Sequence, residues 1–560
     1  IGFLHALRFA VACLSVLNVS VNAASSTVRD ALDDGRLGLY PTQDFRLLKG
    51  ACQDCATIPQ ALWYFRDDLI ALPKSAPTEF SPKLEAQEDV RNWASSHLAG
   101  EGKKPPLLWL GSPQVAENVR LKRDGSALIG ADGQQIPFAV VPKIASNLSY
   151  YDASSVRHFA DRPLRLRGRM EQERFTARTV WPEDYALDFA KLPYQPLKAG
   201  ETLAALVRAD GTKASAPLAA RVLWQRDPQA TRQWSGKPVI AFMLNGAQGD
   251  DDEAHGGHFA VATGVFRGQP AAQLGQAERG DWGDWIVNNF YNLDSVSEKG
   301  IVASMLPMDG YMTDLNSGQA WYRPSYMLVA VLKQERVAGL YQEAIGRVFN
   351  HFYRHDFHYR HAAANCAGVS IETLRSLGWR IPEAGPSSLL KASAALPYMA
   401  IKEMSLDSGL NAYDYLAAER SNLYPLVAFA AIGGDLLQRF TTAAAAETAF
   451  ERMLADDVEA LIYVRIPQFP SSRALGQAPI ESIDEYMDRV PEDKSKWKIV
   501  PVPPRPFPAE LKDPNAPAEP IPPSRFALCA YAALLALGVF FVYKTLRRRM
   551  TQGAQQSAKQ

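Results

Sequence analysis

Residues His351–Gly378, HFYRHDFHYRHAAANCAGVSIETLRSLG, contain the helix start around which the predicted fold is organised. After Asn365, apolar residues recur at helical spacing, and Gly378 stands where a C-cap glycine belongs. Asn is a favourable N-cap, so Cys366 is expected in the first turn. The N–H groups and the positive dipole end of a helix start favour thiolate, the nucleophilic form of cysteine.

A nucleophilic cysteine needs a base, which can lie far away in the sequence. The best candidate is His258, which directly precedes an apolar β run in GDDDEAHGGHFAVATGVF. Gly256 and Gly257 allow a tight entry to that strand and would fix the imidazole at its mouth. His255 is the alternative base.

The surrounding elements follow a definite order. A strand is expected before the His258 strand, two strands after it, then an amphipathic helix, and then Asn-Cys opening a further helix. The expected ranges are Val239–Leu244, Phe259–Phe266, Trp285–Leu293, Ser325–Leu332 and, for the helix, Gln334–Phe352.

This succession resembles the circularly permuted branch of the NlpC/P60 papain-like superfamily, which includes lecithin retinol acyltransferase-like proteins. The resemblance covers about 239–379 and implies a thiol hydrolase or acyltransferase that uses no cofactor. It also implies a polar third catalytic residue on the strand WIVNNFYNL, which is Asn289 or Asn288. Asn365 and the N–H groups of the helix start would stabilise the oxyanion.

Two alternatives remain open for the same stretch. A free cysteine is among the most buried residue types and is often structural, in which case the chain would be a catalytically silent binding or assembly protein. Alternatively, His351, His355, His358 and His361 could form a metal site with Cys366, because i, i+4 spacing places two histidines on one helix face. The second alternative lacks an H-E-x-x-H motif.

Length and composition limit the number of domains and the classes of partner that are expected. At 560 residues, with 47 % hydrophobic residues, two or three domains are expected. The 60 basic and 60 acidic side chains cancel, and no basic stripe interleaved with aromatics is evident, so nucleic acid is not an expected partner.

The two ends predict export and anchoring. Residues 1–24 have the pattern of a signal peptide, and 525–546 form an apolar run followed by basic residues, as in a membrane helix. The Pro-rich segment 501–524 would be a stiff linker and 547–560 a cytoplasmic tail. A single-pass protein of a bacterial inner membrane, with its body in the periplasm, is therefore expected.

The intervening segments complete the predicted organisation. In 25–104, Cys52 and Cys55 form a CxxC that predicts a local disulfide in an exported chain. Alternating runs in 105–238 predict a β-rich accessory domain. The papain-like domain is expected over 239–392 and a helical region over 393–500.

The sequence as a whole thus predicts an α+β protein with one C-terminal transmembrane helix. Its expected activity is that of a cysteine peptidase, amidase or acyltransferase. The expected substrates are amides or esters of the cell envelope, in peptidoglycan peptides or lipids.

Overall fold

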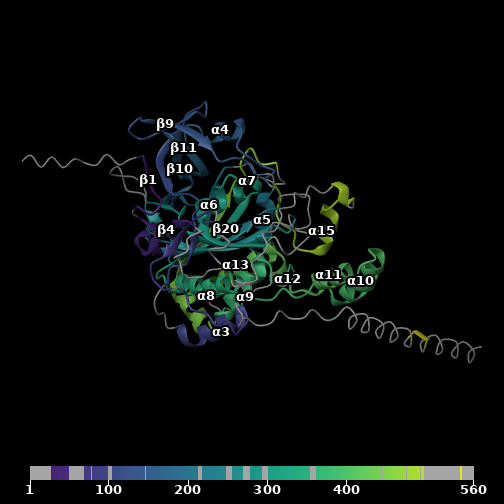
Figure 1. Cartoon of the computed structure of the whole chain (residues 1–560). Helices are drawn as coiled ribbons and strands as arrows, with labels where there is room; N and C mark the ends of the chain where they lie inside the picture. Colours follow the sequence, from purple (N-terminus) through teal and green to yellow (C-terminus); the bar gives the residue numbers. More distant parts are fainter. Residues whose placement is uncertain are drawn as a thin grey trace, which may run out of the picture.

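The computed structural model has a mixed α/β architecture built around one large sheet (Figure 1). It describes residues 27–496, apart from 34, 50–67, 77, 99–103, 145–146, 212–216, 248–254, 269–277, 293–300, 354–360, 363, 443–444, 474–475 and 492, together with 543–544.

The central sheet has seven strands in the order β13-β21-β20-β14-β15-β18-β19. All neighbours in it are antiparallel. The side chains of β14 and β20 are all buried, because helices or strands cover both faces of the sheet's middle. The strands are β13 (Ala219–Gln225), β14 (Pro238–Asn245), β15 (His258–Val265), β18 (Ile286–Asn292), β19 (Ile301–Pro307), β20 (Ser325–Leu332) and β21 (Val458–Ile466).

Local patterns located several of these elements correctly. The four predicted strands correspond to β14, β15, β18 and β20, and the predicted amphipathic helix corresponds to α8 (Arg336–Tyr353). The helix predicted to open at Cys366 is α9 (Cys366–Ser376), and Gly378 has a φ of 101° just after it. This left-handed conformation favours glycine and ends the helix.

A second sheet has the order β1-β7-β10-β11-β9-β8, and an additional β7–β8 pairing closes five of its strands into a ring. Figure 1 shows β9, β10 and β11 at one end of the molecule and α3, α8 and α9 at the other. The strands are β1 (Val28–Asp30), β7 (Gln114–Leu121), β8 (Ala127–Ile129), β9 (Gln135–Val140), β10 (Pro163–Glu171) and β11 (Arg174–Pro182).

The structure also contains three small sheets besides these two large ones. Their strands are β2 (Arg36–Leu37) with β3 (Tyr40–Pro41); β4 (Phe45–Lys49) with β5 (Leu69–Pro73) and β6 (Leu108–Trp109); and β12 (Leu187–Asp188) with β17 (Arg279–Asp281) and β16 (Arg267–Gly268).

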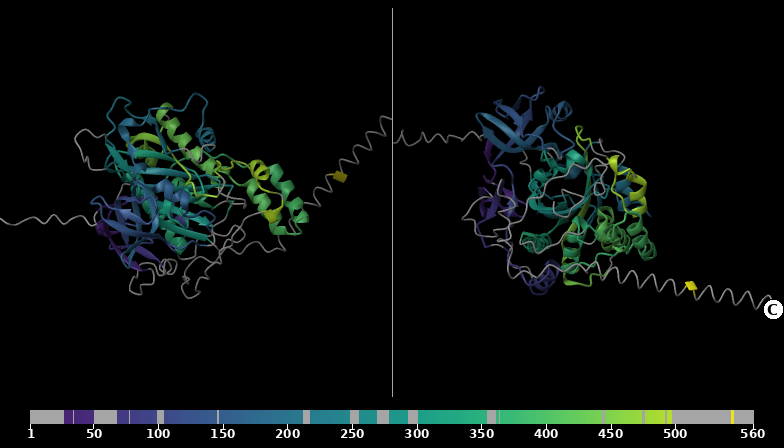
Figure 2. Two further views of the ribbon diagram at one scale, coloured as in Figure 1. Left: turned by 90° about the horizontal axis from the view of Figure 1, so that it is seen from above. Right: turned by 45° about the vertical axis from the view of Figure 1, so that its right-hand side comes forward.

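Helices cover the central sheet, and α10 with α11 projects from the body as a hairpin (Figure 2). The remaining helices are α3 (Ala86–His97), α4 (Ala153–Phe159), α5 (Leu203–Gly211), α6 (Met308–Thr313), α7 (Gln319–Tyr322), α10 (Leu389–Lys402), α11 (Leu406–Ala417), α12 (Arg420–Leu423), α13 (Pro425–Thr442), α14 (Ala449–Asp457) and α15 (Ile483–Arg489). Short 3-10 turns are η1 (Thr42–Asp44), η2 (Glu183–Tyr185), η3 (Phe189–Lys191) and η5 (Lys494–Lys496).

The predicted fold class needs correction. The region 393–500 is not purely helical, because β21 lies within it and pairs with β20 and β13 inside the central sheet. The sheet therefore takes strands from both sides of the predicted 239–392 domain. A mixed α/β body, rather than a self-contained catalytic domain with a helical appendix, describes this part of the chain.

The predicted membrane topology is also corrected. Across the described residues, no helix is both long and apolar enough to cross a lipid bilayer. The longest helices named above, α8 and α13, have 18 residues each and carry charged side chains. A single-pass membrane protein is therefore not supported. Of the predicted span 525–546 only Tyr543 and Lys544 are described, and the predicted signal peptide, linker and tail lie outside the described residues.

Candidate functional site

The site begins at the entry to β15. His258 is the first residue of the strand and pairs with Asn245, the last residue of β14. Gly257 has a φ of 77°, and a Cβ there would lie 2.5 Å from the carbonyl oxygen of Asn245. Only glycine fits this close approach. The predicted role of the glycine pair, a tight entry that fixes the imidazole, therefore agrees with the backbone.

A hydrogen bond joins His258 to Asn289 on the neighbouring strand β18. His258 Nε2 lies 2.7 Å from Asn289 Oδ1, and both side chains are buried. An amide oxygen can only accept a hydrogen bond, so Nε2 carries the proton and Nδ1 has the lone pair. This tautomer is the one that lets Nδ1 act as a base.

Asn288, the alternative orienting residue, faces the other side of the sheet. It pairs with Val261, its Nδ2 donates to Val261 O at 3.2 Å, and its Oδ1 accepts from Gln342 Nε2 at 3.2 Å. Gln342 belongs to α8 and also accepts from Thr263 Oγ1 at 2.8 Å. Since successive side chains of a strand alternate between faces, Asn289 is the residue that reaches His258.

Sequence reasoning missed three further polar residues around His258. Tyr311 of α6 donates its hydroxyl hydrogen to Asn245 Oδ1, and its ring centre lies 6.2 Å from that of His258. Asn245 Nδ2 in turn donates to Ser325 Oγ at 2.7 Å. Asn245 is the last residue of the apolar strand β14 and Ser325 is the first residue of the apolar strand β20. A polar residue at the end of an apolar run is a signal that could have identified both, whereas the position of Tyr311 depends on the packing of α6.

The electrostatic setting keeps His258 neutral. Burial, with Arg323 nearby, lowers the pKa of His258 to about 3, and the hydrogen bond to Asn289 opposes this only in part. Arg323 is held close by its Nη1, which donates to Gly246 O at 3.2 Å. At neutral pH the imidazole is therefore in the form that accepts a proton.

The candidate nucleophile occupies the first position of α9. Cys366 is buried, with 7 % of its surface exposed, and α9 packs against β15 and β18. Asn365 is the N-cap, because its Oδ1 accepts from the N–H groups of Ala367 and Gly368, both at 2.9 Å. The helix start therefore forms as predicted around the thiol.

Asn365 acts as a positioning residue rather than as an oxyanion donor. Its Nδ2 donates to His361 O at 2.7 Å and to Leu423 O at 2.8 Å. Both amide hydrogens are therefore used within the fold.

Replacing Asn365 by Ala should lower the free energy of unfolding by about 1–2 kcal/mol, because a buried cap and two further hydrogen bonds are lost. Ser388→Ala removes the N-cap of the partly exposed helix α10, where Ser388 Oγ accepts from Lys391 N. Ser388→Ala should lower the free energy of unfolding by less, about 0.5–1 kcal/mol. Urea unfolding followed by circular dichroism measures both, and equal losses would contradict the buried role of Asn365.

A chain of contacts brings the start of α9 to the start of β15. Asn365 bonds Leu423 O, Leu423 packs against Ile480 in a small apolar cluster, and Ile480 N donates to His255 O at 3.1 Å. His255 and His258 flank the glycine pair at the strand entry. These contacts link Asn365, at the start of α9, with His255, at the entry to β15, through Leu423 and Ile480.

The metal alternative gains no support from the described residues. Among them, no group of three or more His, Cys, Asp or Glu side chains could hold a metal ion. His351 contacts Asp89 of α3: its Nε2 lies 3.2 Å from Asp89 Oδ2. Arg347 forms an ion pair with the same carboxylate. His355 and His358 lie outside the described residues.

The predicted disulfide between Cys52 and Cys55 also lies outside the described residues.

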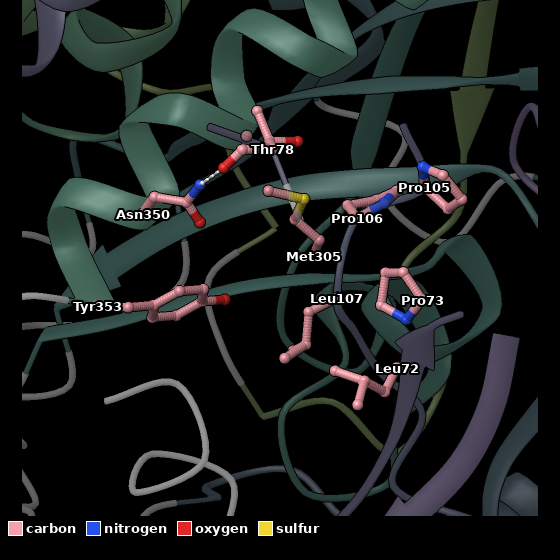
Figure 3. A pocket seen from close by; sticks show the side chains of 10 residues that line it. Leu72, Pro73, Thr78, Pro105, Pro106, Leu107, Met305, Asn350 and Tyr353 are labelled. Atoms are coloured by element: carbon pink, nitrogen blue, oxygen red, sulfur yellow. Dashed lines mark hydrogen bonds between the residues drawn. The ribbon is translucent and has the colours of Figure 1, made fainter. Parts of the chain in front are cut away.

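A mainly apolar pocket beside α8 is separate from these residues. Figure 3 shows its wall, where Asn350 Nδ2 donates a hydrogen bond to Thr78 O. Neither Cys366 nor His258 nor Asn289 lines it. It is therefore not the candidate catalytic site. Its lining residues are Leu72, Pro73, Thr78, Pro105, Pro106, Leu107, Met305, Gly346, Asn350 and Tyr353.

Comparison of the chain with protein-family models, with curated proteins and with solved structures gives no match. The function is therefore argued from the site alone.

Proposed function

We propose that this chain is a thiol-dependent acyl-transfer enzyme, a hydrolase or acyltransferase of papain-like type that acts on an ester or amide carbonyl. The observation that carries the proposal is the buried His258–Asn289 hydrogen bond of 2.7 Å at the start of β15. It fixes the tautomer that a base for a cysteine nucleophile needs. Cys366, at the capped start of α9, is the proposed nucleophile.

The proposed reaction has two stages. His258 Nδ1 takes the proton of the Cys366 thiol while the sulfur attacks the carbonyl carbon, and the carbonyl π electrons move to oxygen. When the tetrahedral intermediate collapses, the imidazolium protonates the departing alcohol or amine and a thioester remains on Cys366. Water, or a second alcohol or amine, then attacks the thioester, gives its proton to His258 and releases the acyl product as sulfur is reprotonated.

Asn289 and Tyr311 act on this reaction through position. Asn289 holds the imidazole in its working tautomer, and Tyr311 packs beside the ring and fixes Asn245 under the strand entry. The resemblance to permuted NlpC/P60 proteins makes peptide amides and lipid esters the substrates to screen.

An activated ester tests the proposal without knowledge of the substrate. With p-nitrophenyl acetate we expect one equivalent of nitrophenolate per chain in an initial burst, and an acetyl group on the peptide that contains Cys366. Cys366→Ser should remove the thioester, and His258→Gln should slow the burst by about 10²–10⁴-fold, the usual contribution of a general base. His97→Gln changes an exposed histidine on α3 and should leave the burst unchanged.

The variants separate the rival outcomes. Loss of the burst in His255→Gln, with His258→Gln unaffected, would assign the base to His255. A burst that survives in Cys366→Ser, or an intact and folded protein that never acetylates Cys366, would refute the enzyme and favour a structural cysteine. Circular dichroism of each variant confirms that the loss is not one of folding.

A further inference from the structure

The hairpin of α10 and α11 projects from the body of the molecule (Figures 1 and 2). In the described part of the chain its two helices pack chiefly against each other. Large apolar side chains of α10, and of the turn that follows it, are nevertheless between 58 % and 90 % exposed. They are Leu389, Leu390, Tyr398, Ile401 and Met404.

Exposed apolar residues follow one face of α10. Inside the helix they recur at steps of three or four, the spacing that aligns side chains along a helix. The line continues past the end of the helix at Lys402. The resulting apolar ridge consists of Leu390, Ala394, Pro397, Tyr398, Ile401 and Met404.

The hairpin is built the opposite way round from a pair of helices in water. A helix in water usually turns its large apolar side chains toward the protein. Here small residues lie between the helices: Ala392 of α10 and Gly409 of α11 are buried. A Cβ on Gly409 would lie 2.4 Å from the carbonyl oxygen of Leu396, so the two helices approach closely. Small residues between helices and large apolar residues outside them are typical of helices that contact lipid.

The polar side chains of α10 also suit the boundary between lipid and water. Lys391 and Lys402 stand near its two ends, and the helix contains no Asp or Glu. Lys402 Nζ lies 6.0 Å from the centre of the Tyr398 ring, and Lys391 Nζ lies 3.2 Å from Asp484 Oδ2 of α15. At such a boundary lysine stems lie along the apolar layer while their amines reach water, and tyrosine rings are enriched.

Length and charge define how this hairpin can meet a membrane. With 14 residues α10 is shorter than the roughly 20 that a helix needs to cross a bilayer, so it would lie along the surface. Residues 389–417 contain two lysines and three carboxylates, a formal net charge of 2 − 3 = −1. The attraction would therefore come from apolar side chains and would not require anionic lipid.

We propose that the apolar ridge docks the protein on the surface of a lipid bilayer, with α10 parallel to that surface. A projecting ridge can enter a fluid apolar layer without a matching groove, and the buried apolar area supplies the affinity. A second copy of the chain is a poorer partner, because a symmetric antiparallel pair of ridges would place lysine against lysine. The docking does not depend on the proposed acyl-transfer chemistry.

Hydrogen–deuterium exchange of the full chain, followed by mass spectrometry with and without phosphatidylcholine vesicles, tests the docking. Exchange in 389–404 should slow by about tenfold at saturating vesicles, because the covered helix opens less often. Ile401→Ser combined with Met404→Ser should abolish this slowing, since both side chains lose the apolar area that the bilayer would bury. Ile144→Ser combined with Met170→Ser makes the same replacements at exposed residues outside the hairpin and should keep it.

The same experiment separates the other occupants. Vesicle binding that leaves exchange in 389–404 unchanged, or equal slowing in the two double variants, would overturn the docking. Slowing that appears without vesicles as the protein concentration rises would assign the ridge to a second copy and would also overturn it. Equal slowing on vesicles with and without phosphatidylserine would support apolar docking, whereas slowing that requires phosphatidylserine would contradict it.

Discussion

Replacement of Asp284 by Asn is expected to lower the free energy of unfolding by about 3–5 kcal/mol, the usual cost of breaking a buried ion pair. Asp284 pairs with Arg165, Arg167 and Arg267, and the first two side chains are 2 % and 3 % exposed. Although burial acts to raise it, these arginines hold the pKa of Asp284 far below its usual range. A neutral amide in its place leaves buried positive charge without compensation.

The measurement is urea unfolding of the full chain at neutral pH. Asp161→Asn is the matched control, because Asp161 pairs with Arg123 on the surface and both side chains are more than half exposed. It should change the free energy of unfolding by at most about 0.5 kcal/mol, as surface pairs usually do. Losses of similar size in the two variants would show that the Asp284 cluster does not stabilise the fold.

The sequence pattern does not predict that the arginines of this ion-pair cluster are buried. In PLRLRGRM the arginines alternate with leucines, which predicts a strand with one face in solvent. β10 is indeed a strand, but Arg165 and Arg167 are buried against Asp281, Asp284 and Asp309. Those partners lie more than 100 residues later in the chain, and no local periodicity indicates a pairing at that distance.

In the central sheet, too, local sequence patterns identify individual strands but not the long-range pairing between them. All eight residues of β14 are buried and the first seven are nonpolar. An apolar run of that length between turn signals indicates a buried strand. The residues of β21, VEALIYVRI, fall within the region 393–500 that is predicted to be helical, although they are rich in β-branched and aromatic residues. Helical segments precede β21 in the sequence, and the strand that places it in the sheet, β20, lies more than 100 residues earlier in the chain.

For the candidate site, the sequence indicated residue types at element boundaries. His258 is indicated by the apolar β run that follows it, and Cys366 by the favourable N-cap Asn365. In the structure β15 begins at His258 and α9 begins at Cys366. The choice between Asn288 and Asn289 needed the strand register, since neighbouring residues face opposite sides of a sheet. Tyr311 could not be found locally, because α6 reaches the imidazole only through tertiary packing.

His258 should also make the protein sensitive to acid. Its pKa is about 3 in the folded chain because of burial, with Arg323 adding to the effect, whereas an unfolded histidine has a pKa of about 6.5. Between these values the unfolded chain binds more protons than the folded chain, so the free energy of unfolding rises with pH and is lost as pH falls. Going from pH 7.5 to pH 5 should remove about 2 kcal/mol through this residue.

His258→Gln should remove that part of the loss while keeping a donor near Asn289. Urea unfolding at the two pH values measures the difference for each variant. Burial, with a smaller contribution from Arg162, lowers the pKa of His158 to about 4. This second histidine also makes the free energy of unfolding fall with pH, so His258→Gln should keep a smaller pH dependence of its stability. His97→Gln, on an exposed part of α3, should behave as the wild type does. If His258→Gln and the wild type lose equal stability, the imidazole is not buried in its neutral form.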